Sequence, residues 1–486
     1  MQKSVNTIHM KHLRFLRGAA AVSLGAVVSK GIGAVYRIAL SALLPALGMG
    51  LYQMAWPFFC LFLTLTSAGA GYALSRTVAR ERALGRSGRG ALLAGLRLFA
   101  LLGGVGGALL FVFAPALGAL QGASLASAYR ILAPAVVLGG VLAVLRGYFQ
   151  GARRMGTSAL SEVFETLVKA GLGVFLVLCF RGEAHASALA ALGAVVLSEG
   201  AALLYLALSL RGERKVPDLM PRQSASFLLP AVLPVMASAC ILPLSQALDS
   251  VLLPHLLGGG EGAVLSFGLL TGGAFALAAL PASAARGLAA AAVPSLAALS
   301  ARGEARAAKK RALFALGAAL LVVLPCALFL FFFAGRIAHI LYPALAEGER
   351  ALLRSLIRAT AFTSLAVAGA DTLASSLTGL GKASRAACAM LLAAALKIVL
   401  QAVLVPRMGV MGGAIALNAC FWVAFSLDLF YTVRSHHRRR AQYDHDHRSG
   451  NARGGALAQG GQLPEGGALR AGARRIARVG SGAERA

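Results

Sequence analysis

The chain has 486 residues, of which 58% are hydrophobic and only 13% are charged. A soluble domain normally carries about a quarter of its residues as charged side chains, so the composition excludes an ordinary soluble protein. A net charge of +29 would suggest nucleic-acid binding in a soluble chain. Here the excess of cations falls between apolar runs and in residues 436–486, which is typical of a membrane protein without a nucleic-acid partner.

Apolar runs of about 20 residues recur along the chain, and each can cross a hydrocarbon core of about 30 Å as a helix. Their continuity favours helices over a barrel, whose strands would alternate in hydropathy. We therefore predict an all-α polytopic membrane protein with about twelve transmembrane helices. The predicted spans are 16–44, 50–75, 91–114, 129–150, 158–180, 186–210, 226–256, 263–299, 312–335, 356–378, 384–405 and 410–433.

Basic residues gather before the first predicted helix and after every second one. The clusters lie at residues 3–17, 80–89, 153–154, 211–222, 302–311, 382–385 and 438–440. The intervening loops carry few charges, except for 336–354, where arginines are mixed with Glu347 and Glu349. By the positive-inside rule, this alternation predicts a multi-pass inner-membrane protein with both termini in the cytoplasm.

The even number of helices suggests an internal duplication. A shift of 228 positions superposes Arg130 on Arg358, Gly151 on Gly379 and Lys169 on Lys397. We predict two six-helix lobes, 1–222 and 223–435, related by an axis along the membrane normal, with the cleft between them as the substrate site. Residues 436–486 are rich in Gly, Arg and Ala, which predicts a disordered basic cytoplasmic tail.

Motifs for catalysis or cofactor binding are missing from the sequence. It contains no GxxxxGK[S/T] loop for nucleotide phosphates, and the His445/His447 pair beside Asp444 and Asp446 is expected to bind a metal only adventitiously. The six cysteines lie in separate apolar segments without the spacing of a metal site or of a disulfide framework. We therefore expect a protein that is not an enzyme and that uses no cofactor or metal.

Ionisable residues inside the predicted helices are the main functional candidates, because an isolated charge in a bilayer costs several kcal/mol. Lys30 and Arg37 are seven positions apart and share one face of the first helix. We predict that they and Arg286 line a cavity and bind an anionic substrate. For Arg37, snorkelling to the interface is the alternative.

Other intramembrane charges suggest further roles. We predict that Asp249 and Asp371 act in gating or ion coupling, since Asp249 lies on a proline-rich span, 226–256. Glu165, Lys169 and Lys397 are predicted to form an intramembrane charge network. The four-residue spacing of Glu165 and Lys169 leaves open that these two only neutralise each other. Asp428, near the end of the last span, is expected to reach water.

Several stretches resemble the stage V sporulation protein B group of polysaccharide-export proteins. They are Gly33-Ala-Val-Tyr-Arg-Ile38, Gly48-Met-Gly-Leu-Tyr-Gln-Met54, Arg146-Gly-Tyr-Phe-Gln-Gly151 and Gly379-Leu-Gly-Lys382. That group is part of the multidrug/oligosaccharidyl-lipid/polysaccharide (MOP) superfamily, with the lipid II flippase and the multidrug and toxin extruders (MATE). The resemblance implies two six-helix lobes around a cavity that opens alternately to either side.

The resemblance also implies a function: flipping a polyprenyl-(pyro)phosphate-linked oligosaccharide or cell-wall precursor from the inner to the outer leaflet. Membrane lipids and proteins of cell-envelope synthesis are the partners it implies. Ser29-Lys30 resembles a serine–cation pair in the lipid II flippase cavity. Many members of the superfamily have fourteen helices, two more than predicted here. An ion-coupled multidrug exporter of the MATE type and a non-transporting cell-wall or spore-coat assembly factor are the alternative functions.

Overall fold

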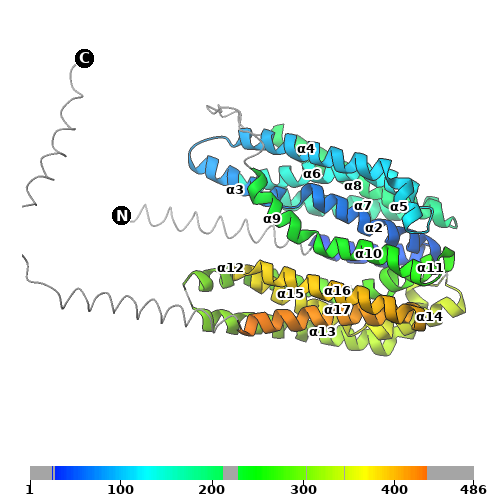
Figure 1. Cartoon of the computed structure of the whole chain (residues 1–486). Helices are drawn as coiled ribbons and strands as arrows, with labels where there is room; N and C mark the ends of the chain where they lie inside the picture. Colours follow the sequence, from blue (N-terminus) through cyan, green and yellow to red (C-terminus); the bar gives the residue numbers. More distant parts are fainter. Residues whose placement is uncertain (1–24, 26–27, 212–227, 303, 344, 435–486) are drawn as a thin grey trace, which may run out of the picture. The chain divides into compact units, whose positions relative to one another are not determined.

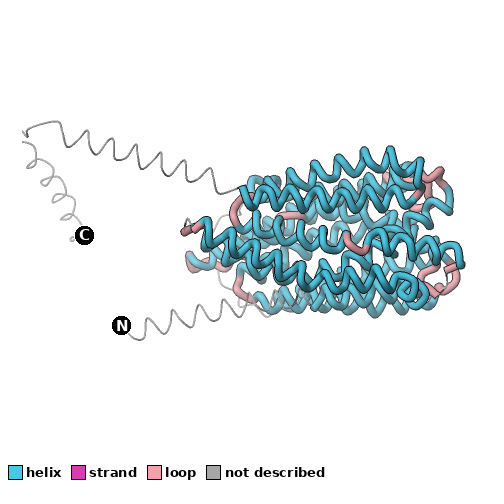
Figure 2. Tube along the Cα trace, turned by 90° about the horizontal axis from the view of Figure 1, so that it is seen from below, coloured by secondary structure: helices cyan, strands magenta, loops and turns pink. Residues whose placement is uncertain are grey.

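A computed structural model describes residue 25 and residues 28–211, 228–302, 304–343 and 345–434. In this part of the chain every regular element is helical (Figure 2). The structure therefore confirms the all-α prediction. The proposed lobe boundary at 222/223 and the tail 436–486 lie outside the described residues and stay predictions.

The first half contains the helical segment 28–43 and seven labelled helices (Figure 1). These are α2 (Ala46–Ser67), α3 (Ala70–Ala83), α4 (Arg89–Val112), α5 (Ala114–Leu120), α6 (Ala126–Gly151), α7 (Met155–Cys179) and α8 (Ala184–Arg211). Between α2 and α3, Gly69 has a φ of 82°, a conformation that glycine adopts without steric cost. The two helices therefore form one interrupted run, and α5 is a short addition at the end of α4.

The second half is divided into more pieces. It consists of α9 (Leu229–Ala239), α10 (Ile241–Leu256), α11 (Gly260–Gly268), the π-helix η2 (Leu269–Phe275), α12 (Ala276–Ala301), α13 (Ala305–Leu341), α14 (Glu347–Thr360), α15 (Thr363–Gly379), α16 (Ala383–Met408) and α17 (Val410–Arg434). The axes of α14 and α15 meet at a bend of 43°. Joined across their short breaks, these elements make six long runs.

By length and hydropathy, nine helical runs of the described chain can cross a membrane, and the bent pair α14–α15 makes a tenth. The other two predicted spans correspond to α7, which is 25 residues long and contains three charged residues, and to the segment 28–43. About twelve transmembrane helices in two lobes is therefore the architecture of this chain.

Several helices extend beyond the predicted spans. The clearest case is α13, whose 37 residues include Arg306 and Lys309, which we expected in a loop. Such a helix is about 55 Å long at 1.5 Å per residue, so it extends past the bilayer core. Lysine and arginine are good helix formers, which is why a change in hydropathy did not mark the end of the helix.

The helix ends follow the predicted 228-residue repeat. Helix α6 ends at Gly151 and α15 at Gly379, while α7 begins at Met155 and α16 at Ala383. The two glycines also pack alike. A Cβ on Gly151 would lie 2.6 Å from the carbonyl oxygen of Ser75 in α3, and one on Gly379 would lie 3.1 Å from that of Val293 in α12. In each half the fourth transmembrane run therefore ends against the backbone of the second.

The two halves meet along α2, which packs against α10 and α11. Two glycines allow a close approach there, since a Cβ on Gly268 would lie 2.6 Å from the Cα of Gly50. Small residues allow this direct backbone contact between membrane helices, where packing rather than the hydrophobic effect holds helices together.

Candidate functional site

A polar cavity of about 380 Å³ lies between elements of both halves. Its walls come from the segment 28–43, α2, α6 and α7 in the first half and from residues 276–283 of α12 in the second. We predicted a substrate site in the cleft between the halves, and the cavity lies at such a place.

The charged lining of the cavity is mostly cationic. It consists of Lys30, Arg37, Arg146 and Lys169 together with Glu162 and Glu165. With all six ionised, the four cations outnumber the two carboxylates. Inside a membrane this excess favours an anionic ligand, because an uncompensated charge remains there only with a partner or with water.

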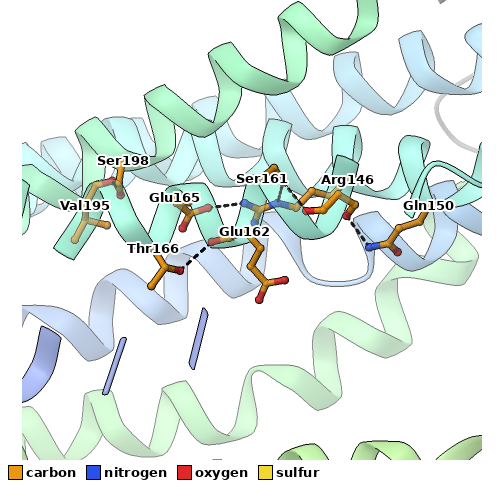
Figure 3. A network of polar contacts seen from close by, with 9 residues as sticks. Arg146, Gln150, Ser161, Glu162, Glu165, Thr166, Val195 and Ser198 are labelled. Carbon is orange, nitrogen blue, oxygen red and sulfur yellow. Dashed lines mark hydrogen bonds and ion pairs between the residues drawn. The ribbon is translucent and has the colours of Figure 1, made fainter. Parts of the chain in front are cut away.

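The Arg146 cluster is the best-defined part of the wall (Figure 3). The Nη2 atom of Arg146 in α6 lies 2.6 Å from Oε2 of Glu165 in α7, and its Nε donates to Oγ of Ser161 at 2.9 Å. This ion pair neutralises Glu165, and it joins α6 to α7. Glu165 therefore pairs with Arg146 rather than with Lys169, the alternative that the four-residue spacing had left open.

The first-helix cations occupy the predicted positions. Lys30 and Arg37 both line the cavity and both are exposed to it, which agrees with their placement on one face of the segment 28–43. The Ser29 side chain beside them is buried. Their role as substrate contacts stays a prediction.

A second charged cluster lies inside the second half, apart from the cavity lining. The Nζ atom of Lys397 in α16 lies 2.5 Å from Oδ2 of Asp249 in α10 and donates to Oγ of Ser245 at 2.7 Å. The Lys397 side chain is only 3% exposed. The three residues predicted as one network are therefore divided: Glu165 and Lys169 line the cavity, whereas Lys397 pairs with Asp249.

The remaining predicted residues lie in the second half. Arg286 belongs to α12, but its side chain is outside the described residues. Asp371 in α15 is half-buried. Asp428 in α17 is 3% exposed, so our expectation that it reaches water was wrong. Helix α17 continues to Arg434, and packing encloses the aspartate before the helix reaches its end.

Sequence reasoning missed two features of the wall. Arg146 appeared only within a family motif, although an arginine four residues inside a predicted span should have counted as an intramembrane charge. The stacked rings of Tyr52 and Trp56, with centroids 5.7 Å apart, also line the cavity. The signal for this pair was its four-residue helical spacing, which is equally typical of packing residues.

Comparisons with known proteins place the chain in context. Residues 15–300 match the family model described as polysaccharide biosynthesis protein. Among curated proteins of Bacillus subtilis (strain 168), the chain is 33% identical to stage V sporulation protein B over 198 residues, which is 40% of this chain and 38% of the relative. It is 29% identical to lipid II flippase MurJ over 168 residues, 32% of this chain and 31% of that protein. The matches thus span about a third of these relatives.

Solved structures share the fold along most of the chain. An inward-facing multidrug resistance MATE family transporter of the MOP superfamily superposes with a TM-score of 0.70 at 19% identity, covering 85% of this chain and 96% of that one. An outward-facing transporter of the same description has a TM-score of 0.62 at 18% identity, with 85% and 94% covered. At these identities the likeness establishes the fold of this chain.

The Arg146–Glu165 pair should contribute to stability through direct coupling. Arg146→Ala leaves a partly buried carboxylate without its guanidinium, so thermal unfolding of the purified protein in detergent should begin at a lower temperature. Adding Glu165→Gln should recover part of the loss, with a coupling energy of about 1–3 kcal/mol. Additive losses in the double variant would contradict the pairing.

The two lysines at repeat-related positions provide a matched comparison. Lys397→Met strands Asp249 in the protein interior and should cost about 3–5 kcal/mol, or prevent accumulation of the folded protein. Lys169→Met, on the cavity wall, should cost much less. Asp249→Asn in the Lys397→Met background should restore stability, as measured by thermal unfolding. Equal losses for both lysines would show that the buried pair is not the cause.

Proposed function

Because the chain belongs to the polysaccharide biosynthesis protein family, we propose that it moves a lipid-linked saccharide across the membrane by alternating access. The substrate we propose is a polyprenyl-(pyro)phosphate-linked oligosaccharide or cell-wall precursor, carried from the inner to the outer leaflet. Proteins that make or use this lipid in envelope synthesis would be its partners. The observation that carries the proposal is the excess of cations in the cavity between the halves.

A pyrophosphate headgroup fits this chemistry. Hydrogen bonds from arginine or lysine to phosphate oxygens are charge-assisted and about twice as strong as neutral ones. The proposed phosphate contacts are Lys30, Arg37 and Lys169, the cations that the segment 28–43 and α7 bring to the cavity wall. Because cations outnumber carboxylates in the cavity, each negative charge of a dianionic phosphate group would have a cation near it.

The rest of the lining suits a sugar. Tyr52 and Trp56 contribute aromatic surface with polar edges, and Ser283 contributes a hydroxyl group. Such a mixture of aromatic surface and a few hydrogen-bonding groups is common in small-molecule sites. These residues support a saccharide next to the phosphate contacts.

A multidrug exporter is the other function with support, because the solved structures that share the fold include multidrug resistance transporters. Cationic drugs, however, would be repelled by a cavity in which cations outnumber acids. The same polar cavity favours a transporter over a non-transporting assembly factor. We therefore keep lipid-linked saccharide transport as the proposal.

Asp249 has a role of its own in this proposal. Its bond to Lys397 connects α10 to α16 within the second half. We infer that this pair keeps the two helices together while the halves move, which is the gating role open to a carboxylate away from the cavity. Asp371, in α15 of the same half, stays a candidate for ion coupling.

The cavity cations can be tested directly. Lys30→Ala and Arg37→Ala should each reduce flipping of a polyprenyl-pyrophosphate-linked sugar in proteoliposomes about ten- to hundredfold, the equivalent of one charge-assisted hydrogen bond. Lys30→Arg and Arg37→Lys are the matched controls and should retain most activity. Headgroup accessibility in the outer leaflet is the measurement.

Membrane insertion and thermal unfolding of these variants should equal those of the wild type. Normal flipping by both alanine variants would overturn the cationic-cavity proposal. Export of cationic drugs that is unaffected by either variant would favour the multidrug function instead.

We also propose a location in the bacterial plasma membrane with cytoplasmic termini, on the strength of the loop charges. Leu84, exposed after α3, would then lie inside, and Arg181, exposed before α8, outside. In a variant without the native cysteines, Arg181→Cys should react with a membrane-impermeant maleimide in intact cells. Leu84→Cys should react only after permeabilisation, and the reverse result would invert the topology.

A further inference from the structure

A buried glutamine joins the two halves at one end of the helices. Gln121 follows α5, and its side chain is only 1% exposed. Its Nε2 donates to the carbonyl oxygen of Met54 in α2 at 2.9 Å and to Oγ of Ser250 in α10 at 2.8 Å. Its Oε1 accepts a hydrogen bond from the hydroxyl of Tyr129 in α6.

These bonds use both amide hydrogens of the glutamine and its carbonyl oxygen. Met54 and Tyr129 belong to the first half, so they orient the amide, whereas Ser250 belongs to the second half. The Ser250 hydroxyl donates to the carbonyl oxygen of Ala247 at 2.8 Å, which leaves its oxygen free to accept from Gln121. Away from water each of these polar groups is costly to leave unpaired, so the arrangement is specific.

Close backbone contacts also lie in this region. The backbone contact between Gly50 and Gly268 lies there, and Gly48 abuts the carbonyl oxygen of Ala184, where α8 begins. The charged part of the cavity lies at a different depth, whereas Tyr52 and Trp56 of its lining flank Met54 on α2. On α6, Tyr129 and Arg146 are 17 residues apart, which is about 25 Å along a helix. We call the end marked by Gln121 the sealed end.

We propose that Gln121 is the latch of the sealed end: its bond to Ser250 holds α10 against α2 and α6, and breaking that bond lets the cavity open toward this end. The inference rests on the alternating access of the proposed function but not on the identity of the substrate. Opening breaks the Ser250 bond, while the bonds to Met54 and Tyr129 stay within the moving first half.

Because only one of these bonds crosses between the halves, an experiment can tell whether Gln121 holds the halves together or only fills space. Ser250→Ala removes the bond between the halves, together with the bond to the carbonyl oxygen of Ala247 within α10, and keeps the volume of the site nearly unchanged. Tyr129→Phe is the matched control, because it removes a bond to the same glutamine within one half. A latch predicts a change of conformation for the first variant, whereas a packing role predicts similar effects for both.

The test uses the full chain without its native cysteines and with Ser283→Cys as a reporter on the cavity wall. A membrane-impermeant maleimide is applied to sealed vesicles of each orientation. In the Ser250→Ala background, labelling from the side that labels Arg181→Cys should rise about fivefold, the equivalent of one neutral hydrogen bond. Labelling from the opposite side should fall, and Tyr129→Phe should change neither rate by as much.

Three outcomes would overturn the latch: unchanged labelling in folded Ser250→Ala protein, an equal rise from both sides, or an equal effect of Tyr129→Phe. Thermal unfolding identifies variants that fail to fold, and Ser250→Gly with the Ser283→Cys reporter then replaces Ser250→Ala. Labelling needs no substrate, so a shift in labelling without sugar flipping would support the latch and count against the proposed function.

Discussion

A charge in the hydrocarbon core must have a counter-charge, a set of hydrogen bonds or water, and this constraint explains the arrangement of polar residues here. Lys397 meets it with Asp249 and Ser245 inside the second half. Arg146 meets it with Glu165 and Ser161 at the cavity wall. Lys30 and Arg37 meet it by facing the cavity. The cations of the cavity therefore come from the first half, on the segment 28–43, α6 and α7.

The two halves share an arrangement of helices but differ in the surroundings of their repeat-related lysines. Lys169 and Lys397 occupy the fifteenth position of α7 and of α16, counting from Met155 and Ala383. The first faces the cavity and the second is enclosed with an aspartate from α10. The same helical position is therefore exposed in one half and neutralised in the other, which places the open cationic surface mainly on the first half. Because the cations lie mainly on the first half, an anionic ligand would bind between the two halves in one preferred orientation.

Sequence patterns predicted the helix count, the repeat and the placement of Lys30 and Arg37, because hydropathy and helical periodicity are local properties. They did not predict the partner of Glu165, since Arg146 lies on another helix and only the packing of α6 against α7 brings the two together. Asp428 shows the same limit, because its burial depends on neighbouring helices rather than on its distance from the helix end. The Gln121 contacts were also invisible, as a glutamine in a short loop carries no periodic signal.

The π-helical segment η2 separates the Gly268 contact from the cavity residues of α12. A π-turn accommodates one more residue than an α-turn, so it changes the direction in which the side chains of the following helix point. One residue corresponds to about 100° of rotation in an α-helix. Without this insertion, Ala276, Leu280 and Ser283 would turn away from the cavity while Gly268 stayed in place. A single-residue difference in η2 between otherwise similar chains would therefore give each a different cavity wall behind the same junction of the halves.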